Sequence, residues 1–397
     1  MSEAIGSTRR SVVNLDKLGI VIAVIAAAAW IFLPFVVFRA NRIVLGEART
    51  VFAALPPLEA GVVALATGIG IVTAFYKTPT LVRLVVSLAV LAVLAVFVGR
   101  AGTHLTPEGN TFARISPGAG FWVVSFAFAL MAADALTRLQ LRPWPRIGLL
   151  AGVALAIGAL LWSGGWNDLS ILKEYATRAD AFWREGRTHI LLAFGSLAAA
   201  AVIGVPLGIT CYRHPKLRTG VLNVLNAVQT IPSIALFGLL IAPLGWLAMQ
   251  VPAAAAIGIS GIGAAPALLA LFLYSLLPVV ANTVVGLVGV PESANDAARG
   301  MGMTDRQRLF GVELPLAFPV ILTGIRIVLV QNIGLATIAA LIGGGGFGVF
   351  VFQGIGQTAM DLVLLGAVPT VALAFAAAVV LDAFVEMASH GRREAGT

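Results

Sequence analysis

Long apolar runs separated by short polar segments repeat along the whole chain. A helix needs roughly 20 apolar residues to cross about 30 Å of hydrocarbon, and these runs approach or reach that length. Backbone groups in lipid must be hydrogen-bonded within their own segment, and the runs lack the alternation of barrel strands. We therefore predict an all-α polytopic membrane protein with about ten spans, near residues 18–38, 58–75, 81–99, 118–137, 147–163, 189–210, 222–242, 266–289, 318–341 and 361–385.

The composition supports a membrane protein and narrows its chemistry. Hydrophobic residues make up 59% of the chain and charged residues 11%, with a mean hydropathy of +0.98, values far outside the soluble range. The net charge of +8 is spread over short loops, so we expect no nucleic-acid partner. The single cysteine, Cys211, precludes an internal disulfide, and the four histidines lack metal-ligand spacing. We expect no metal, no cofactor and no catalytic residue in this chain.

The distribution of basic residues predicts the orientation of the spans. Cytoplasmic loops of membrane proteins retain an excess of Lys and Arg. With the N-terminus inside, 16 of the 26 basic residues, beginning with Arg9 and Arg10, fall in cytoplasmic segments; nine fall outside and Arg326 lies within a span. We therefore predict that both termini are cytoplasmic, including a tail at 390–397.

Two less regular segments divide the chain. Residues 166–188 form a polar connection on the external side, for which a short surface helix and a solvated loop are both open. The connection separates a five-span region at 1–165 from a second group of spans at 189–389, which holds most of the patterned polar residues. The stretch 242–265 is rich in Gly, Pro and Ala. As a full span it would invert everything downstream, so we expect an external or re-entrant segment.

The polar segment 291–317 carries the clearest pattern in the chain. Its early alanines form helix with little bulk, and its glycine suits a turn with positive φ. It is either an ordinary interhelical loop or a short rigid element at the cytoplasmic face on which a partner protein acts. The residues that make up the pattern are Glu292, Asp296, Ala297, Ala298, Gly302, Val312, Leu314 and Pro315.

This spacing resembles the Glu-Ala-Ala loop, EAA-x3-G-x9-I-x-LP, of permease subunits in ATP-binding-cassette (ABC) importers, with Asp296 in place of the usual Glu. The resemblance implies a type I importer permease core in the C-terminal half. It implies that the loop couples the spans to separate ATPase subunits, which use the ATP. It also implies a second permease, identical or homologous, an external substrate-binding protein, and a place among the lipids of the inner membrane.

Four stretches resemble the osmoprotectant branch of these permeases, whose members import glycine betaine, choline, carnitine or proline betaine. They lie at 230–235, 297–304, 312–316 and 340–348, within a resemblance that covers 186–389. The five N-terminal spans are similar to those of a longer betaine-uptake subgroup. The resemblance implies import of a compatible solute, with no bond chemistry in this chain.

Polar and proline residues in the core spans are candidates for the solute pathway or its gate, namely Gln229, Pro232, Ser233, Asn282, Arg326, Gln331 and Asn332. Pro232 either kinks a span or marks the start of a helix. Arg326 either lines the pathway or extends to the membrane surface, because it lies about two turns into its span. The glycine run 343–346 is no phosphate-binding loop, since the chain has no Gly-Lys dipeptide. We expect a flexible external connection there.

Two other classes of protein remain as alternatives. A secondary transporter driven by an ion gradient would show paired intramembrane carboxylates or inverted repeats. The carboxylates Asp361, Asp382 and Glu386 lie near span ends, and no repeat relates the two halves. A membrane-embedded enzyme would show a nucleophile with a base, or a metal cluster, and neither pattern is present in the sequence.

Overall fold

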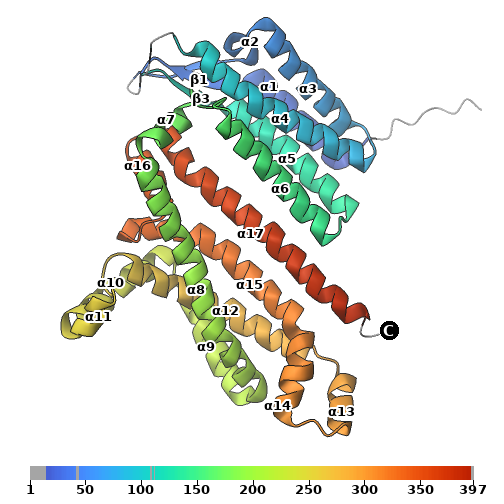
Figure 1. Ribbon diagram of the computed structural model, residues 1–397, viewed down its shortest axis with the longest axis vertical. Coiled ribbons are helices and arrows are strands. Elements are labelled where there is room, and N and C mark those ends of the chain that lie inside the picture. The colour runs from blue at the N-terminus through green and yellow to red at the C-terminus, as the bar shows by residue number, and fades with distance from the viewer. Residues whose placement is uncertain (1–14, 42–43, 108–109, 111, 395–397) are drawn as a thin grey trace, which may run out of the picture. The chain divides into compact units, whose positions relative to one another are not determined.

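The computed structural model (Figure 1) describes residues 15–41, 44–107, 110 and 112–394, with side chains up to residue 389. Arg9 and Arg10, and the side chains of the predicted tail 390–397, lie outside the described residues. The chain forms two compact units with separate apolar cores. The first unit comprises Met1–Leu141 and Ala154–Lys173, and the second comprises Arg142–Val153 and Glu174–Thr397.

The first unit is a group of apolar helices with small residues at their contacts. Ala26, Ala60 and Ala127 are completely buried, and such small side chains let helix backbones approach closely. Its elements are α1 (Lys17–Phe32), β1 (Val36–Arg39), β2 (Glu47–Arg49), α2 (Val51–Ala54), α3 (Pro57–Phe75), α4 (Thr80–Leu105), β3 (Arg114–Pro117), α5 (Ala119–Leu139) and part of α6 (Pro143–Trp162).

A small antiparallel sheet, in the order β2-β1-β3, departs from the predicted all-helical fold. Val36 lies opposite Arg49 on one side and Pro117 on the other. The expected span 18–38 is therefore too long: the helix ends at Phe32, because Pro34 disfavours helical backbone at the residue before it. The β-branched residues that follow pair as a strand instead.

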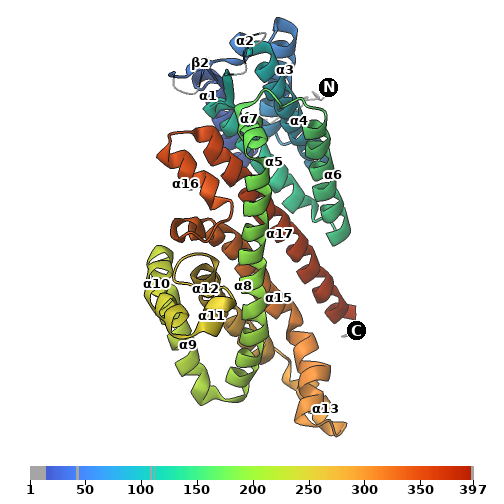
Figure 2. The same ribbon diagram turned by 60° about the vertical axis from the view of Figure 1, so that its left-hand side comes forward.

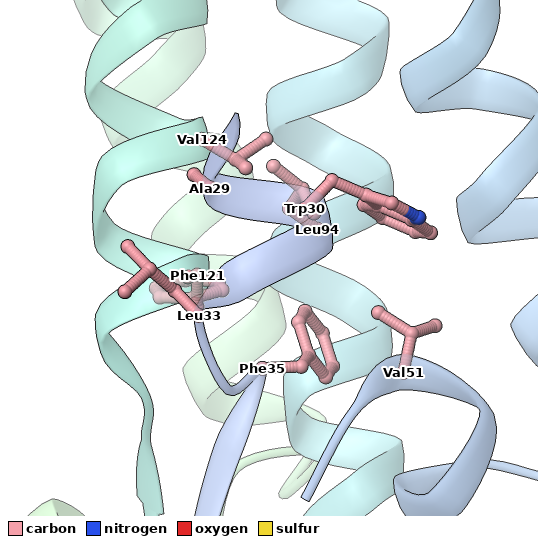
Figure 3. Close-up of a pocket in the computed structure, with 9 residues that line it drawn as sticks. Ala29, Trp30, Leu33, Phe35, Val51, Leu94, Phe121 and Val124 are labelled. Carbon is pink, nitrogen blue, oxygen red and sulfur yellow. The ribbon is translucent and has the colours of Figure 1, made fainter. Parts of the chain in front are cut away.

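A small apolar pocket lies in the first unit (Figure 3). Its volume is about 20 Å³, which is room for a single water molecule. Trp30 of α1, Phe121 of α5 and Phe35 in the turn after α1 line it, together with aliphatic side chains. The pocket is too small for an organic solute, so it is a packing feature of this unit.

In the second unit, long helices lie side by side (Figures 1 and 2). Helix α8 packs against α12 and α15, and α15 packs against α17. The elements are α8 (Ala179–Arg213), α9 (Pro215–Thr230), α10 (Ser233–Gln250), α11 (Pro252–Ala256), α12 (Ala264–Val288), α13 (Glu292–Gly300), α14 (Asp305–Arg308), the π-helix η1 (Leu309–Glu313), α15 (Leu314–Ala336), the 3-10 helix η2 (Ile338–Ile342), α16 (Gly348–Gly356) and α17 (Met360–Glu394). Helix α7 (Ser170–Thr177) precedes α8.

Within the described residues, nine helical stretches are long and apolar enough to cross a membrane. The remaining expected span corresponds to α1, a shorter apolar helix of 16 residues. The prediction of a helical membrane protein with about ten spans is therefore confirmed, although several boundaries differ. Helix α8 begins at Ala179, ten residues before the expected start, and α17 continues through residues 390–394 of the predicted tail.

The predicted span 222–242 is wrong as a single helix. Helix α9 ends at Thr230, and α10 begins at Ser233, directly after Pro232. Helix α10 then runs to Gln250, so the first part of the irregular stretch 242–265 is helical. Sequence hydropathy could not locate this break, because apolar residues continue on both sides of the proline.

A buried ion pair anchors α1 to α4. The Asp16 carboxylate accepts a hydrogen bond from the Gly19 N–H at 2.8 Å and lies 2.8 Å from the Arg83 guanidinium, whose side chain is 2% exposed. Burial opposes ionisation of Asp16, but the Gly19 N–H and Arg83 outweigh it and hold the pKa of this carboxyl below its usual value. The stabilisation is therefore present at neutral pH and is lost as the pH falls through the lowered pKa.

We expect Asp16→Asn to destabilise the protein by about 3 kcal/mol, because it leaves the buried Arg83 charge uncompensated while asparagine retains the ability to cap the helix. The matched control is Glu59→Gln, which removes a pair whose Arg100 side chain is 61% exposed and costs about 0–1 kcal/mol. Thermal melting of the full chain in detergent at neutral pH measures both. Equal melting temperatures for the two variants would contradict the stabilising role of the Asp16–Arg83 pair.

Candidate functional site: the coupling element and the polar contacts of the core

The segment that connects α12 to α15 folds as a compact helical element and not as an open loop. We call residues 291–313 the coupling element; it consists of α13, a glycine turn, α14 and η1. The helices α13 and α14 lie together at the end of the second unit that is opposite α16 (Figures 1 and 2). Only Ala298 of α13 is buried, whereas Glu292, Asp296 and Ala297 are exposed.

Local sequence explains the turn in the coupling element. Gly302 has a φ of +77°, a conformation that glycine adopts without steric cost. The Met303 N–H then donates to the Ala298 carbonyl at 3.1 Å, which closes the end of α13. Thr304 and Gln307 form a capping box at the start of α14: the Gln307 N–H donates to the Thr304 hydroxyl, and the Thr304 N–H donates to the Gln307 side chain.

The second half of the pattern joins the coupling element to the first turn of α15. Leu314 packs with Leu287 and Ile321 between α12 and α15, while Val312 is half-buried and Pro315 is exposed. The structure thus brings the predicted residues into one element with two faces. Glu292, Asp296, Ala297 and Gly302 lie on the exposed face, and the apolar residues of its second half join the element to the helix core.

The sequence analysis missed a buried ionic contact in the same element. The Glu313 side chain is 1% exposed and lies 3.1 Å from Arg308 and 2.9 Å from Arg213 at the end of α8. Arg308 also lies 2.9 Å from Asp305 at the start of α14. The sequence did offer one sign of this contact, because Glu313 is a charged residue between the apolar Val312 and Leu314. Its partner Arg213 lies 100 positions away, and nothing in the sequence linked the two residues.

The break between α9 and α10 is held by two contacts to α12. Pro278 lies inside α12 and has no N–H, so the Tyr274 carbonyl lacks its intrahelical donor. The Gln229 side chain supplies this donor at 2.7 Å, and the Tyr274 hydroxyl donates to the Ile231 carbonyl. Pro232 is exposed at the break and Ser233 is half-buried at the start of α10. Pro232 therefore precedes a helix start and does not kink a continuous helix.

The remaining gate candidates lie in α12 and α15. Asn332 is completely buried and donates to Ser196 of α8 at 2.9 Å and to Ser275 of α12 at 2.8 Å, so it joins three helices in this conformation. Asn282 donates to the carbonyl of Pro278, four residues earlier in its own helix. Gln331 is half-buried beside Asn332.

Arg326 is paired with a carboxylate of α17. It donates to Asp382, which also accepts a hydrogen bond from Arg146 at 2.8 Å, and Arg146 in turn contacts Glu386. The opposite charges offset the cost of placing Arg326 within a span. Asp382 and Glu386, two of the three carboxylates near span ends that the sequence analysis weighed for a secondary transporter, both contact arginine.

The glycine run at the opposite end of the unit is fixed by α8. Gly343, Gly345 and Gly346 have φ values of +74°, +76° and +86°. The Gly346 N–H donates to the Glu185 carboxylate at 2.9 Å, and the Phe347 N–H donates to Nδ1 of the buried His189 at 3.3 Å. The expectation of a flexible connection therefore needs correction, because these hydrogen bonds tie the loop to a membrane-length helix.

Comparison with known proteins agrees with this architecture. The profile of the binding-protein-dependent transport system inner membrane component matches residues 200–393, and that of the N-terminal domain of the ABC transporter permease YehY matches residues 16–172. The osmoprotectant import permease protein OsmW of Salmonella typhimurium is 45% identical over 49% of this chain and 83% of its own length. The chain belongs to the osmoprotectant permease family of ABC importers.

Two further relatives support the assignment of this permease to the osmoprotectant family. The osmoprotectant import permease protein OsmY of Salmonella typhimurium is 37% identical over 62% of this chain and 94% of its own length. The choline transport system permease protein OpuBB of Bacillus subtilis is 35% identical over 52% and 87%. The predicted family and type I permease core are thus confirmed. A chain of the MetNI methionine ABC transporter, in an inward-facing conformation, aligns over 52% of this permease and 96% of its own length, with 22% identity and a TM-score of 0.47.

We expect Gly346→Ala to destabilise the permease by about 1–2 kcal/mol, because a side chain at positive φ is strained and its Cβ would lie 3.1 Å from Nδ1 of His189. Hydrogen exchange at residues 346 and 347 should accelerate. The control is Gly356→Ala in α16, where a Cβ meets no atom within 4 Å. Thermal melting and exchange measured by mass spectrometry test both variants; identical protection in the two would refute the anchoring role of α8.

Proposed function

We propose that this permease imports a compatible solute with a quaternary ammonium group, such as glycine betaine or choline, and that separate ATPase subunits drive the import. The observation that carries the proposal is the exposed coupling element at one end of the helix core, with the spacing of the importer loop. The printed functions of the relatives, osmoprotectant import and choline transport, support the solute class. The ATPases consume the ATP, and this chain carries out no bond chemistry.

The two faces of the coupling element suit a mechanical role. A groove of the ATPase would receive the exposed face, where Ala297 permits close approach and Glu292 and Asp296 offer charge. Its second half, with Val312 and with Leu314 and Pro315 in the first turn of α15, would transmit the movement to α12 and α15. Two such permeases, identical or homologous, would form the pathway, and an external binding protein would deliver the solute. Closure of the ATPases would then switch the core from inward-open to outward-open.

We further propose an inner-membrane topology with both termini in the cytoplasm. The predicted loop 291–317, which contains the coupling element, is then cytoplasmic, and the glycine loop at 343–346 faces outside. The proposal keeps the predicted division into a five-span region at 1–165, an external connection at 166–188, the transport core at 189–389 and a cytoplasmic tail at 390–397, with α8 beginning inside the connection and α17 continuing into the tail. The excess of basic residues on the segments assigned to the cytoplasm supports this orientation.

An ion-gradient-driven secondary transporter is the alternative function. It requires carboxylates that can bind and release a proton or cation within the membrane. Asp382 and Glu386 instead contact arginines of this chain, so their charges are already paired. This pairing favours the ATP-driven mechanism, and uptake experiments distinguish the two directly.

The central test replaces Gly302. We expect Gly302→Val to abolish co-purification of an ATPase from native membranes in mild detergent, because a β-branched residue is strongly disfavoured at positive φ. Gly302→Asn is the matched control, since asparagine tolerates this conformation, and it should retain the ATPase. Uptake of radiolabelled glycine betaine into proteoliposomes should require internal ATP and the external binding protein. Uptake driven by an ion gradient alone, with no ATPase retained by the unchanged chain, would replace this proposal with the secondary transporter.

The orientation can be tested with single cysteines. Cys211 is completely buried and is the only cysteine, so Cys211→Ser provides a background without thiols. Ser293→Cys in α13 should react with a membrane-impermeant maleimide only from the cytoplasmic side. Gln357→Cys, which is exposed between α16 and α17, should react only from outside. The reverse pattern, or reaction of both from one side, would overturn the proposed topology.

A further inference from the structure

Glu313 is a buried charge at the junction of the coupling element and the transport core. Its side chain is 1% exposed, and burying a carboxylate is costly unless it is paired. We propose that Glu313 is the positioning residue that joins the coupling element to α8, so that a force applied to the coupling element moves α8 together with α15. This role rests on the proposed function and adds a residue outside the importer loop pattern.

The π-helix explains how the contact forms. In η1 the backbone widens to hydrogen bonds between residues five apart, and Arg308 and Glu313 are separated by five positions. The π-turn therefore places the Arg308 guanidinium against the Glu313 carboxylate, at 3.1 Å. π-helices are rare and are often found at functional sites. Here the π-turn lies directly between the exposed face of the coupling element and the start of α15.

One carboxylate thus connects three segments. Oε1 of Glu313 accepts from Arg308, the last residue of α14, and Oε2 accepts from Arg213 at the C-terminal end of α8. The Arg213 guanidinium also donates to the Asp305 carbonyl at 3.4 Å. Glu313 itself immediately precedes the first residue of α15. The coupling element is therefore attached by charge to α8, in addition to its continuous backbone connection to α15.

Helix α8 extends the connection to the other end of the unit. Its 35 residues correspond to about 50 Å of helix. Near its start, Glu185 and His189 hold the backbone of the glycine loop. The same helix therefore contacts the coupling element at one end and the glycine loop at the other (Figure 2). A displacement of Arg213 is mechanically linked to the loop that, in the proposed topology, faces the external binding protein.

Stability alone gives a weaker account of these residues. Buried ion pairs are poor evidence for stabilisation, because the desolvation of both charges offsets their attraction. The inner face of the coupling element is already held by apolar packing around Leu287, Ala317 and Ile321. Ile209 and Tyr212 of α8 also pack against this cluster, and the ionic contact adds a directional, hydrogen-bonded connection at the very end of α8.

The test uses the complete importer, with its ATPase and binding protein, in proteoliposomes, and radiolabelled glycine betaine as the probe. We expect Glu313→Gln to lower the amount of solute imported per ATP hydrolysed by about tenfold, a typical size for coupling between sites. The ATPase should remain bound, because the exposed face is unchanged. Arg213→Gln should lower the same ratio of import to hydrolysis. Because the native Arg213 side chain is 29% exposed, this variant tests the proposal even if Glu313→Gln does not assemble.

Glu174→Gln is the matched control. Glu174 is a buried glutamate that lies 2.8 Å from Arg178, with a side chain 4% exposed, and it belongs to α7, which precedes the end of α8 that is opposite Arg213. Its ratio of import to hydrolysis should stay at the native value. The proposal is overturned if import and hydrolysis fall in parallel in Glu313→Gln and Arg213→Gln, if neither changes, or if the control loses coupling equally. Absence of ATP-driven uptake by the native importer would remove the proposed function itself, and this role with it.

Discussion

Inside a membrane, no water is present to form hydrogen bonds with backbone groups that lose their partner at a proline or at a helix break. Such groups must be bound by the protein itself, and this constraint is visible in the second unit. At two irregular points of this unit, a side chain binds a backbone group that the helices leave open. Gln229 supplies the donor that Pro278 removes, and Tyr274 binds the carbonyl at the end of α9. Glu185 accepts from the backbone of the glycine loop. The irregular points are therefore fixed positions between helices.

Charged side chains within the membrane-length helices also need partners inside the protein. Arg326 lies in an apolar helix, and Asp382 of a neighbouring helix offsets its charge, while Arg146 contacts the same carboxylate. At the end of the unit, Glu313 is almost completely buried and contacts two arginines. The Arg326–Asp382 pair thus joins α15 to α17, and the Glu313–Arg213 pair joins the start of α15 to the end of α8.

The coupling element has an exposed polar half and a half that packs against the helix core. Its exposed half depends on local chemistry: a positive-φ glycine closes α13, and a capping box starts α14. Its inner half depends on packing, since Leu314 enters the cluster between α12 and α15. Within the π-turn, the chain passes from the polar surface to the apolar core.

The sequence by itself determined the membrane class, nearly all the spans and the importer loop, because hydropathy, proline and glycine act within a few residues of their own positions. The spacing from Glu292 to Pro315 was sufficient to indicate the coupling element. Only the tertiary structure decided that α9 and α10 are separate helices, that a strand follows α1, and that Asn332 joins three helices. It also decided the contact of Glu313 with Arg213. Such contacts depend on which helices become neighbours, and the many apolar faces of a membrane protein leave that choice open in the sequence.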